Sequence, residues 1–189
     1  MQGRASDRVM TAPHPLNPGD LLLIKTHHLV SKLIRFGQRG YGPEAAAWNH
    51  VAIYIGNGEI VEALTNGVVR GYSSKYTSSD VRVFRVKAKV ADTKVVFLDD
   101  DTWTIIENAM RANAASFAIS CVGEKYGFLT IFAIACKVLT KGKIDFNLQG
   151  TSICSGLAAR SLERLGYNWN PWDPGELTPA YLYTCGFES

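Results

Sequence analysis

The sequence predicts a single domain of the mixed α+β class, in which helices flank a small antiparallel sheet. Two patterns lead to this class: an apolar hairpin over residues 48–63, and two segments, 102–120 and 152–166, whose apolar residues recur at helical spacing. The chain has 189 residues, of which 47% are hydrophobic and 20% charged, as expected for one globular domain.

The expected elements start at the turn Gly19-Asp20. The Pro-rich residues 1–17 are interpreted as a flexible segment, and residues 18–189 as the domain. Short strands are expected where apolar residues are continuous or alternate, at 21–24 and 81–86. The glycines and proline of residues 40–43 predict a loop. Helices are expected at 29–36, 102–120, 128–139 and 152–166.

Charge and cysteine content exclude several classes of function. The excess of 20 Lys and Arg over 17 Asp and Glu gives a net charge of +3, too small and too scattered to indicate a nucleic-acid partner. The four cysteines are too few for a disulfide scaffold and lack the spacing of a metal site. A reduced protein without a metal is therefore expected.

No segment of the sequence predicts export or a membrane span. Residues 1–18 lack the apolar core of a signal peptide, which indicates a cytoplasmic protein, with a phage or virion-associated protein as the alternative. The longest apolar stretch, 128–139, is shorter than the roughly 20 residues that a membrane span needs. It is interpreted as a buried helix, so no transmembrane segment is expected.

Cys154 is the first candidate for chemistry because it lies in the first turn of the expected helix 152–166. Free N–H groups and a partial positive charge at such a position stabilise a thiolate, the nucleophilic form of cysteine. The same N–H groups can bind the oxyanion that forms when a carbonyl is attacked. The alternative is a small buried packing residue, which is the commoner role of a free cysteine.

His50 is the candidate base. It lies on the expected hairpin in phase with Ala52 and Tyr54, on the face opposite to the more apolar Val51 and Ile53. A histidine on a strand is more often structural. A histidine on the less apolar face together with a cysteine at a helix start is, however, the minimal pair for thiol catalysis.

Glu62 is the candidate for orienting His50, and the hairpin register decides whether it can. With a three-residue loop, Ala52 faces Glu62, and the carboxylate lies diagonal to His50 on the same face. With a two-residue turn, Ile53 faces Glu62 and the carboxylate points to the other face. The apolar pattern favours the first register, because it pairs apolar residues with one another.

Other residues are weaker candidates. Trp48 and Tyr54 are candidates for lining a substrate groove, although aromatic residues more often pack cores and lids. His27 and His28 follow the first strand and are interpreted chiefly as surface residues. Asp20 is interpreted as a turn residue.

These motifs together resemble a known family, the circularly permuted branch of the NlpC-type papain-like cysteine hydrolases. Within that branch the YiiX-like proteins are most similar, and the lecithin:retinol acyltransferase-like proteins are more distant. In ordinary members the cysteine precedes the histidine, whereas His50 precedes Cys154 here. The segments that carry the resemblance are Pro18-Gly19-Asp20-Leu21, residues 49–58, Ile60-Val61-Glu62-Ala63 and Ile153-Cys154-Ser155-Gly156-Leu157.

The resemblance implies a permuted papain-like fold and a set of roles. Cys154 matches the nucleophile, His50 the base and Glu62 the third polar position. Tyr126 lies in a segment similar to the one that commonly precedes the cysteine, and is a candidate for binding substrate. Residues 176–180 resemble a common closing segment.

The expected function is therefore a cysteine hydrolase that cleaves an amide or ester through a covalent acyl-enzyme and needs no cofactor. Its substrate would be a peptide, another amide or an acyl-lipid. Two alternatives stay open. One is acyl transfer, since the apolar residues 128–139 suit a lipid-like acyl group. The other is a non-catalytic binding or structural module that retains the fold.

Overall fold

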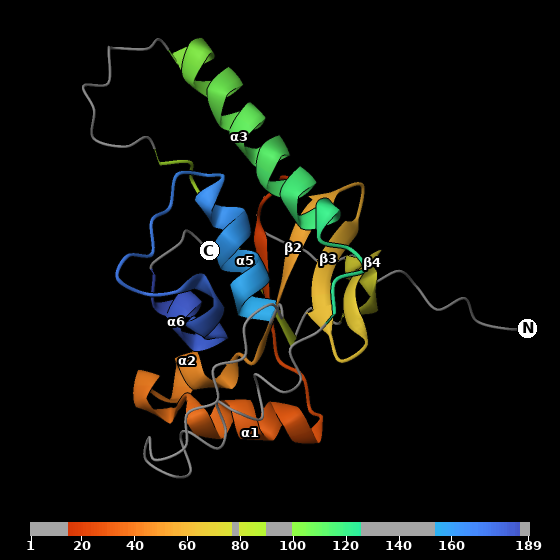
Figure 1. The fold of residues 1–189 in the computed structure, drawn as a ribbon, viewed down its shortest axis with the longest axis vertical. Helices are drawn as coiled ribbons and strands as arrows, with labels where there is room; N and C mark the ends of the chain where they lie inside the picture. Colours follow the sequence, from red (N-terminus) through yellow and green to blue (C-terminus); the bar gives the residue numbers. More distant parts are fainter. Residues whose placement is uncertain (1–14, 77–79, 90–99, 126–153, 186–189) are drawn as a thin grey trace, which may run out of the picture.

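The computed structural model describes residues 15–76, 80–89, 100–125 and 154–185. These residues form a mixed α+β fold, with five antiparallel strands in one small sheet and helices packed against one face and one end of it (Figure 1). The expected α+β class, with a small antiparallel sheet and flanking helices, is confirmed.

The sheet has the order β4-β3-β2-β1-β5, and every neighbouring pair is antiparallel. The middle strand is β2, which begins at His50. Five consecutive residues of β2 are buried, because the strand has neighbours on both sides and side-chain packing on both faces. The strands are β1 (Leu21–Ile24), β2 (His50–Gly56), β3 (Glu59–Leu64), β4 (Gly67–Tyr72) and β5 (Val81–Phe84).

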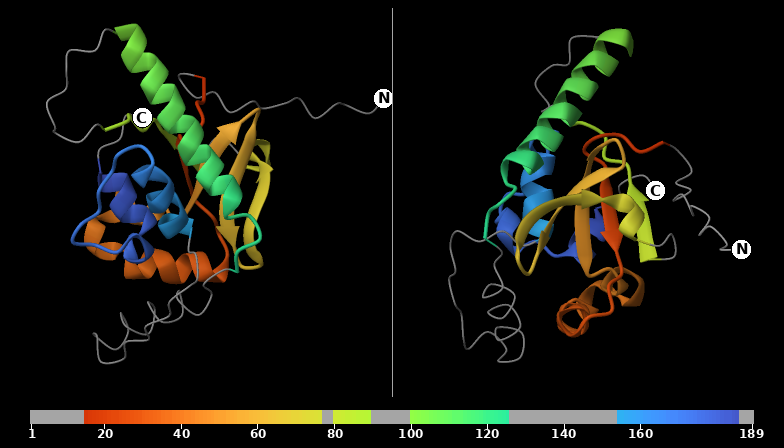
Figure 2. Two further views of the ribbon diagram at one scale, coloured as in Figure 1. Left: turned by 45° about the horizontal axis from the view of Figure 1, so that its top comes forward. Right: turned by 90° about the vertical axis from the view of Figure 1, so that its right-hand side faces the viewer.

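Two helices, α3 and α5, pack against β2 on the same face of the sheet (Figure 1). The far end of α3 extends past the sheet, as the two further views show (Figure 2). The α-helices are α1 (Leu29–Gly37), α2 (Pro43–Ala47), α3 (Asp100–Ser120), α5 (Cys154–Glu163) and α6 (Pro179–Thr184). Short 3₁₀ helices are η1 (Arg39–Tyr41), η2 (Ser73–Lys75) and η4 (Pro174–Glu176).

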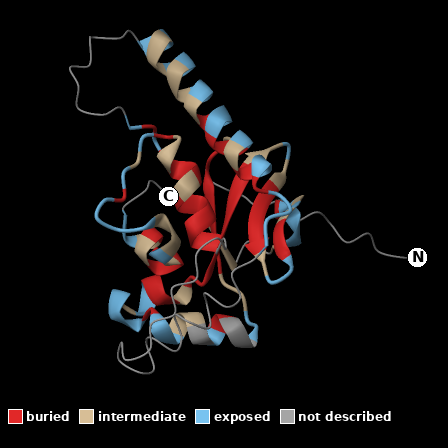
Figure 3. Cartoon of the chain, in the orientation of Figure 1, coloured by how far each residue is buried: buried red, intermediate tan, exposed pale blue. Residues whose placement is uncertain are grey.

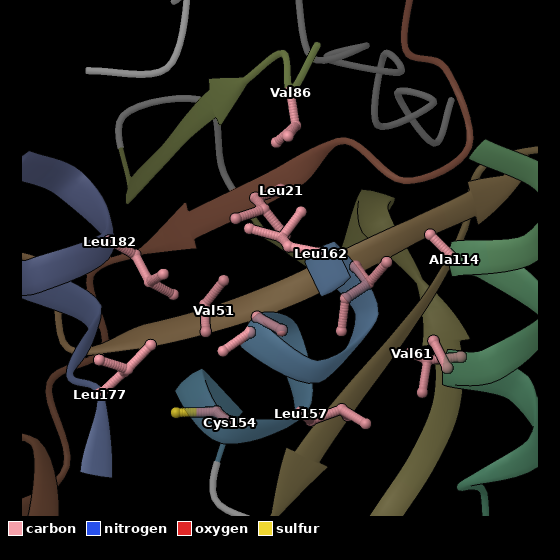
Figure 4. Close-up of a cluster of buried hydrophobic side chains, with 14 of the residues drawn as sticks. Leu21, Val51, Val61, Val86, Ala114, Cys154, Leu157, Leu162, Leu177 and Leu182 are labelled. Atoms are coloured by element: carbon pink, nitrogen blue, oxygen red, sulfur yellow. The ribbon is translucent and has the colours of Figure 1, made fainter. Parts of the chain in front are cut away.

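The alternation along β2 sends its side chains into two apolar clusters, one on each face. Val51 and Ile53 pack in the larger cluster, together with buried residues of α5 (Figures 3 and 4). Ala52 and Tyr54 pack in the smaller cluster. The predicted separation of faces is therefore present, but the face that carries Ala52 is also apolar and buried, because Leu22, Ile24 and Ile60 supply its neighbours.

The β2–β3 hairpin has the register that the apolar pattern favoured, but not the expected loop. Ala52 pairs with Glu62, as predicted. The strands close on Gly56 opposite Glu59, with a bulge between Tyr54 and Gly56, so the expected three-residue loop is wrong. Asn57 and Gly58 form a two-residue turn in which both have positive φ, 52° and 76°, as the tightest hairpin turns require. The bulge adds one residue to β2 before the turn, at Ile55. Ala52 therefore still pairs with Glu62, and the carboxylate stays on the face of His50.

Three elements were not predicted from the pattern: β4, α2 and α6. The two glycines of β4 weaken its strand pattern, and pairing with β3 forms it instead. Proline begins both short helices, α2 at Pro43, where the glycines and proline of residues 40–43 had indicated a loop, and α6 at Pro179. Proline fits the first turn of a helix, because the N–H it lacks has no partner there. The expected strand at 81–86 ends earlier, at Phe84.

Asp20 is a turn residue, as predicted, and it also forms a buried ion pair. Its carboxylate accepts a hydrogen bond from the backbone N–H of Asn17 at 2.8 Å. It also lies 3.0 Å from Nη1 of Arg111 on α3, and Asp20 is fully buried. This pair ties the start of β1 to α3 across the layers of the fold.

Several expectations fall outside the described residues: the first 14 residues of the expected flexible segment, the apolar helix at 128–139, and Ser152 at the expected helix start. Leu16 and Asn17, which the flexible segment was expected to include, contact the smaller cluster and Asp20. Over the described ranges, no helix combines the length and apolar character of a membrane span.

Candidate active site

His50 and Glu62 form a buried hydrogen bond, with Nε2 of the imidazole 2.7 Å from Oε2 of the carboxylate. His50 is 7% exposed and Glu62 is fully buried. Because Ala52 pairs with Glu62, the two residues lie diagonally on one face of neighbouring strands. The structure thus brings together the two residues whose proximity depended on the hairpin register.

Cys154 is the first residue of α5, and its side chain lies close enough to His50 to raise the pKa of the imidazole. Cys154 is 4% exposed and packs with Val51 and Leu157 in the larger cluster (Figure 4). Since Nε2 of His50 faces Glu62, Nδ1 is the ring nitrogen left for the sulfur. One imidazole therefore connects the cysteine and the carboxylate.

The backbone around His50 is held by its neighbour Asn49. The Asn49 side-chain oxygen accepts hydrogen bonds from the backbone N–H of Thr26 at 3.1 Å and from its hydroxyl at 2.6 Å. The Asn49 amide donates to the Thr26 carbonyl at 3.1 Å. These bonds fix the start of β2 to the residues that follow β1. The side-chain oxygen and amide of Asn49 therefore have a structural role.

The start of α5 is held by Ser155. Its hydroxyl donates to the backbone carbonyl of Leu177 at 2.5 Å, and the serine is buried. Leu177 lies between η4 and α6, so this bond joins the first turn of α5 to the C-terminal segment. Small buried residues, such as Ala158 and Ala159, let α5 pack closely on the sheet. Cys154 is thereby held at a fixed distance from β2.

The structure adds two residues that the sequence did not single out, Lys75 and Tyr76. The Tyr76 hydroxyl donates to Oε2 of Glu62 at 2.5 Å, and Nζ of Lys75 donates to Oε1. Both residues belong to the connection from β4 to β5, which are the two edge strands of the sheet. Residues 73–76 of that connection, here called the crossing segment, lie against the face that carries Glu62, so Lys75 and Tyr76 reach the carboxylate from outside the strands. No local sequence signal indicates such a contact.

Burial lowers the pKa of His50, but the hydrogen bonds to Cys154 and Glu62, together with their charges, outweigh it and raise the pKa to about 9. The imidazole therefore holds its proton at neutral pH in the presence of these two partners. A protonated imidazole beside a sulfur is the arrangement that favours a thiolate and imidazolium pair.

Burial raises the pKa of Glu62, but the hydrogen bonds from His50, Lys75 and Tyr76 have a larger opposite effect and lower the pKa to about 2. The carboxylate is therefore ionised at neutral pH. Burial and the hydrogen bond to Glu62 raise the pKa of Tyr76, so that its hydroxyl keeps its proton and acts as a donor.

Trp48 and Tyr54, two expected groove residues, contact the core. Trp48 is buried and stacks on Tyr183, with ring centroids 6.4 Å apart and planes inclined by 18°. The Tyr54 hydroxyl accepts a hydrogen bond from the Gly58 backbone at 2.9 Å, inside the hairpin turn. Their contribution to substrate binding stays a prediction. Tyr126, the third, lies outside the described residues.

His27 lies on the surface, as expected. Its side chain is 74% exposed and faces Asp80 at 3.7 Å, and His28 is also exposed. Within the described ranges, no group of three or more His, Cys, Asp or Glu side chains is arranged to hold a metal ion.

Searches of protein-family models and of curated proteins find no match to this chain. The site is therefore defined by its geometry: a cysteine at a helix start lies beside a buried imidazole, which is hydrogen-bonded to an ionised carboxylate.

Proposed function

We propose that this chain is a cysteine hydrolase that cleaves an amide or ester bond through a covalent acyl-enzyme. Cys154 is the nucleophile, His50 the general base and acid, and Glu62 the group that orients His50. The observation that carries this proposal is that the single imidazole of His50 contacts both the Cys154 side chain and the Glu62 carboxylate.

In the first half of the reaction, the Cys154 sulfur attacks the substrate carbonyl carbon as a thiolate, while Nδ1 of His50 carries the proton. The new C–S bond leaves a negative charge on the carbonyl oxygen, which the N–H groups at the start of α5 would bind. His50 then gives its proton to the leaving amine or alcohol as the C–N or C–O bond breaks. The product is a thioester on Cys154.

In the second half, water attacks the thioester carbon while His50 accepts a proton from it. The C–S bond breaks, the carboxylic acid leaves, and the Cys154 thiolate and the protonated His50 are restored. Throughout, Glu62 holds Nε2–H of His50, so that Nδ1 faces the sulfur. Attack by an amine or alcohol in place of water would make the same three residues an acyltransferase.

The positions of the three residues in the fold also support this assignment. The three residues come from β2, β3 and the start of α5, as the resemblance to permuted NlpC-type papain-like hydrolases implies. The histidine and the acid lie on adjacent antiparallel strands, and the cysteine-bearing helix packs against the same sheet. The permuted papain-like fold is part of the proposal.

The test uses a nitrophenyl ester of a short acyl chain and the intact protein. We expect an acyl adduct on Cys154 in the mass spectrum, removed by hydroxylamine as a thioester is, and no adduct in the Cys154→Ala variant. Cys185→Ala, which removes an exposed cysteine, is the matched control and should leave the adduct unchanged. Equal acylation of wild type and Cys154→Ala would refute the proposal.

A second incubation separates hydrolysis from transfer. The substrates are a short-chain phospholipid and a primary amine, added together with the wild-type protein. Free fatty acid as the main product supports a hydrolase, whereas an acylated amine supports the acyltransferase. Both outcomes need Cys154, so the Cys154→Ala variant is the blank for each.

A further inference from the structure

The Glu62 carboxylate has more partners than orienting one imidazole requires. Oε2 is shared by Nε2 of His50 at 2.7 Å and the Tyr76 hydroxyl at 2.5 Å. Oε1 pairs with Nζ of Lys75. A buried carboxylate with donors on both oxygens cannot rotate without breaking one of these bonds.

Lys75 and Tyr76 are well placed to act as a unit. They are adjacent at the end of η2, and Nζ of Lys75 lies 5.0 Å from the centre of the Tyr76 ring. The Tyr76 ring also lies 6.4 Å from the His50 ring and packs against the smaller apolar cluster. Lys75 is partly exposed, while the carboxylate that it contacts is fully buried.

The segment that carries them is itself anchored. The backbone N–H of Ser73 donates to the Gly58 carbonyl at 2.8 Å, and its hydroxyl donates to the same oxygen at 3.0 Å. The backbone N–H of Tyr76 donates to the Ser73 carbonyl at 3.1 Å. These bonds fix the crossing segment on the hairpin that carries His50 and Glu62.

We propose that Lys75 and Tyr76 are positioning residues, which hold the Glu62 carboxylate in place and limit how strongly it attracts the proton on His50. This inference rests on the proposed thiol chemistry for its meaning in catalysis. The contacts that carry it do not depend on that chemistry.

The physical effect has a definite sign. The positive charge of Lys75 offsets part of the negative charge of Glu62, and the Tyr76 hydroxyl occupies the same oxygen that His50 uses. Removing either donor leaves the carboxylate a stronger acceptor for His50, which stabilises the imidazolium. An imidazolium held more tightly is a weaker acid toward the leaving group.

Among the described residues, the charged and titratable groups that act most on the pKa of Glu62 are His50 from β2, and Lys75 and Tyr76 from the crossing segment. Cys154 from α5 acts on the neighbouring His50 and Tyr76. The carboxylate therefore responds chiefly to these partners.

The test follows the His50 ring by NMR through a pH titration of the full chain, assigned by comparison with His50→Asn. We expect Lys75→Met and Tyr76→Phe each to raise the pKa of His50, by about one pH unit for Lys75→Met, because a charged hydrogen-bond partner is lost. Lys75→Arg should restore the wild-type titration. Tyr76→Phe keeps the shape of the ring, so it carries the test if Lys75→Met does not fold.

Matched controls are Lys32→Met and Tyr72→Phe, which remove an exposed lysine and an exposed tyrosine away from Glu62. Titrations of His50 that coincide in Lys75→Met, Tyr76→Phe and these controls would overturn the inference. A raised pKa in a protein that forms no acyl adduct would support the positioning role and refute the proposed function, so the two failures are distinguishable.

Discussion

The carboxylate of Glu62 lies 2.7 Å from Nε2 of His50, across two neighbouring strands and 12 residues along the chain. This bond gives the imidazole one orientation, in which Nδ1 faces the first residue of α5. His50 and Cys154 are 154 − 50 = 104 positions apart in the sequence. The hairpin orients the imidazole so that these two residues form one site.

Loss of the carboxylate charge should lower activity while the fold is kept. For Glu62→Gln we expect a fall in kcat/KM of about 100-fold or more, because the amide cannot stabilise the imidazolium and can favour the wrong tautomer. Ester hydrolysis measured at pH 7 checks this. Glu59→Gln, at the start of the same strand, is the control and should stay near wild type. Full activity in Glu62→Gln would remove Glu62 from the mechanism.

The rate of amide cleavage should fall as the pH rises through about 9, the raised pKa of His50. Above that pH the imidazole has lost the proton that the leaving amine needs. The measurement is kcat/KM from pH 7 to pH 10.5 with an amide substrate. A nitrophenyl ester is the control, since its leaving group needs no proton and its rate should not fall there. A level profile for the amide would contradict the general-acid role of His50.

The Glu62 contacts should stabilise the fold above acidic pH only. The pKa of this carboxylate is lowered from 4.5 to about 2, so its contribution is complete above pH 4.5 and is lost as the pH falls through about 2. The difference in the free energy of unfolding between wild type and Glu62→Gln should therefore narrow over that range. Denaturant titrations at pH 7, 4 and 2 measure it. A difference independent of pH would show that the carboxylate charge contributes nothing.

Breaking the Asp20–Arg111 pair should cost far more than breaking a surface pair. Arg111→Met leaves the buried Asp20 with only the more distant Arg85, whose Nε lies 3.8 Å away, and we expect a loss of about 3–5 kcal/mol in the free energy of unfolding. Arg164→Met, which removes a partly exposed partner of Glu163, should cost under about 1 kcal/mol. Urea denaturation compares them. Equal losses in the two variants would mean that burial of Asp20 does not matter.

Much of the fold and part of the site follow from local pattern. The apolar run after His50 predicted the middle strand, and helical spacing after Cys154 predicted α5. Pairing of apolar residues predicted the register that puts Glu62 beside His50, even though the loop itself differs. These features are local or depend on one hairpin, so a single sequence carries them.

Contacts between distant segments did not follow from pattern. Lys75 and Tyr76 reach Glu62 because the chain turns back over the face of the sheet after β4. Arg111 meets Asp20 only because α3 packs over the start of β1. Neither contact has a periodic signal, since each depends on the tertiary arrangement rather than on neighbouring residues.

The most direct test of the central claim is the rate at which iodoacetamide alkylates each cysteine at pH 6, mapped by peptide mass spectrometry. The account predicts that Cys154, although buried, reacts at least about 10-fold faster than the exposed Cys185, and that His50→Asn removes this advantage. Faster reaction of Cys185 in the wild type, with no effect of His50→Asn on Cys154, would contradict it.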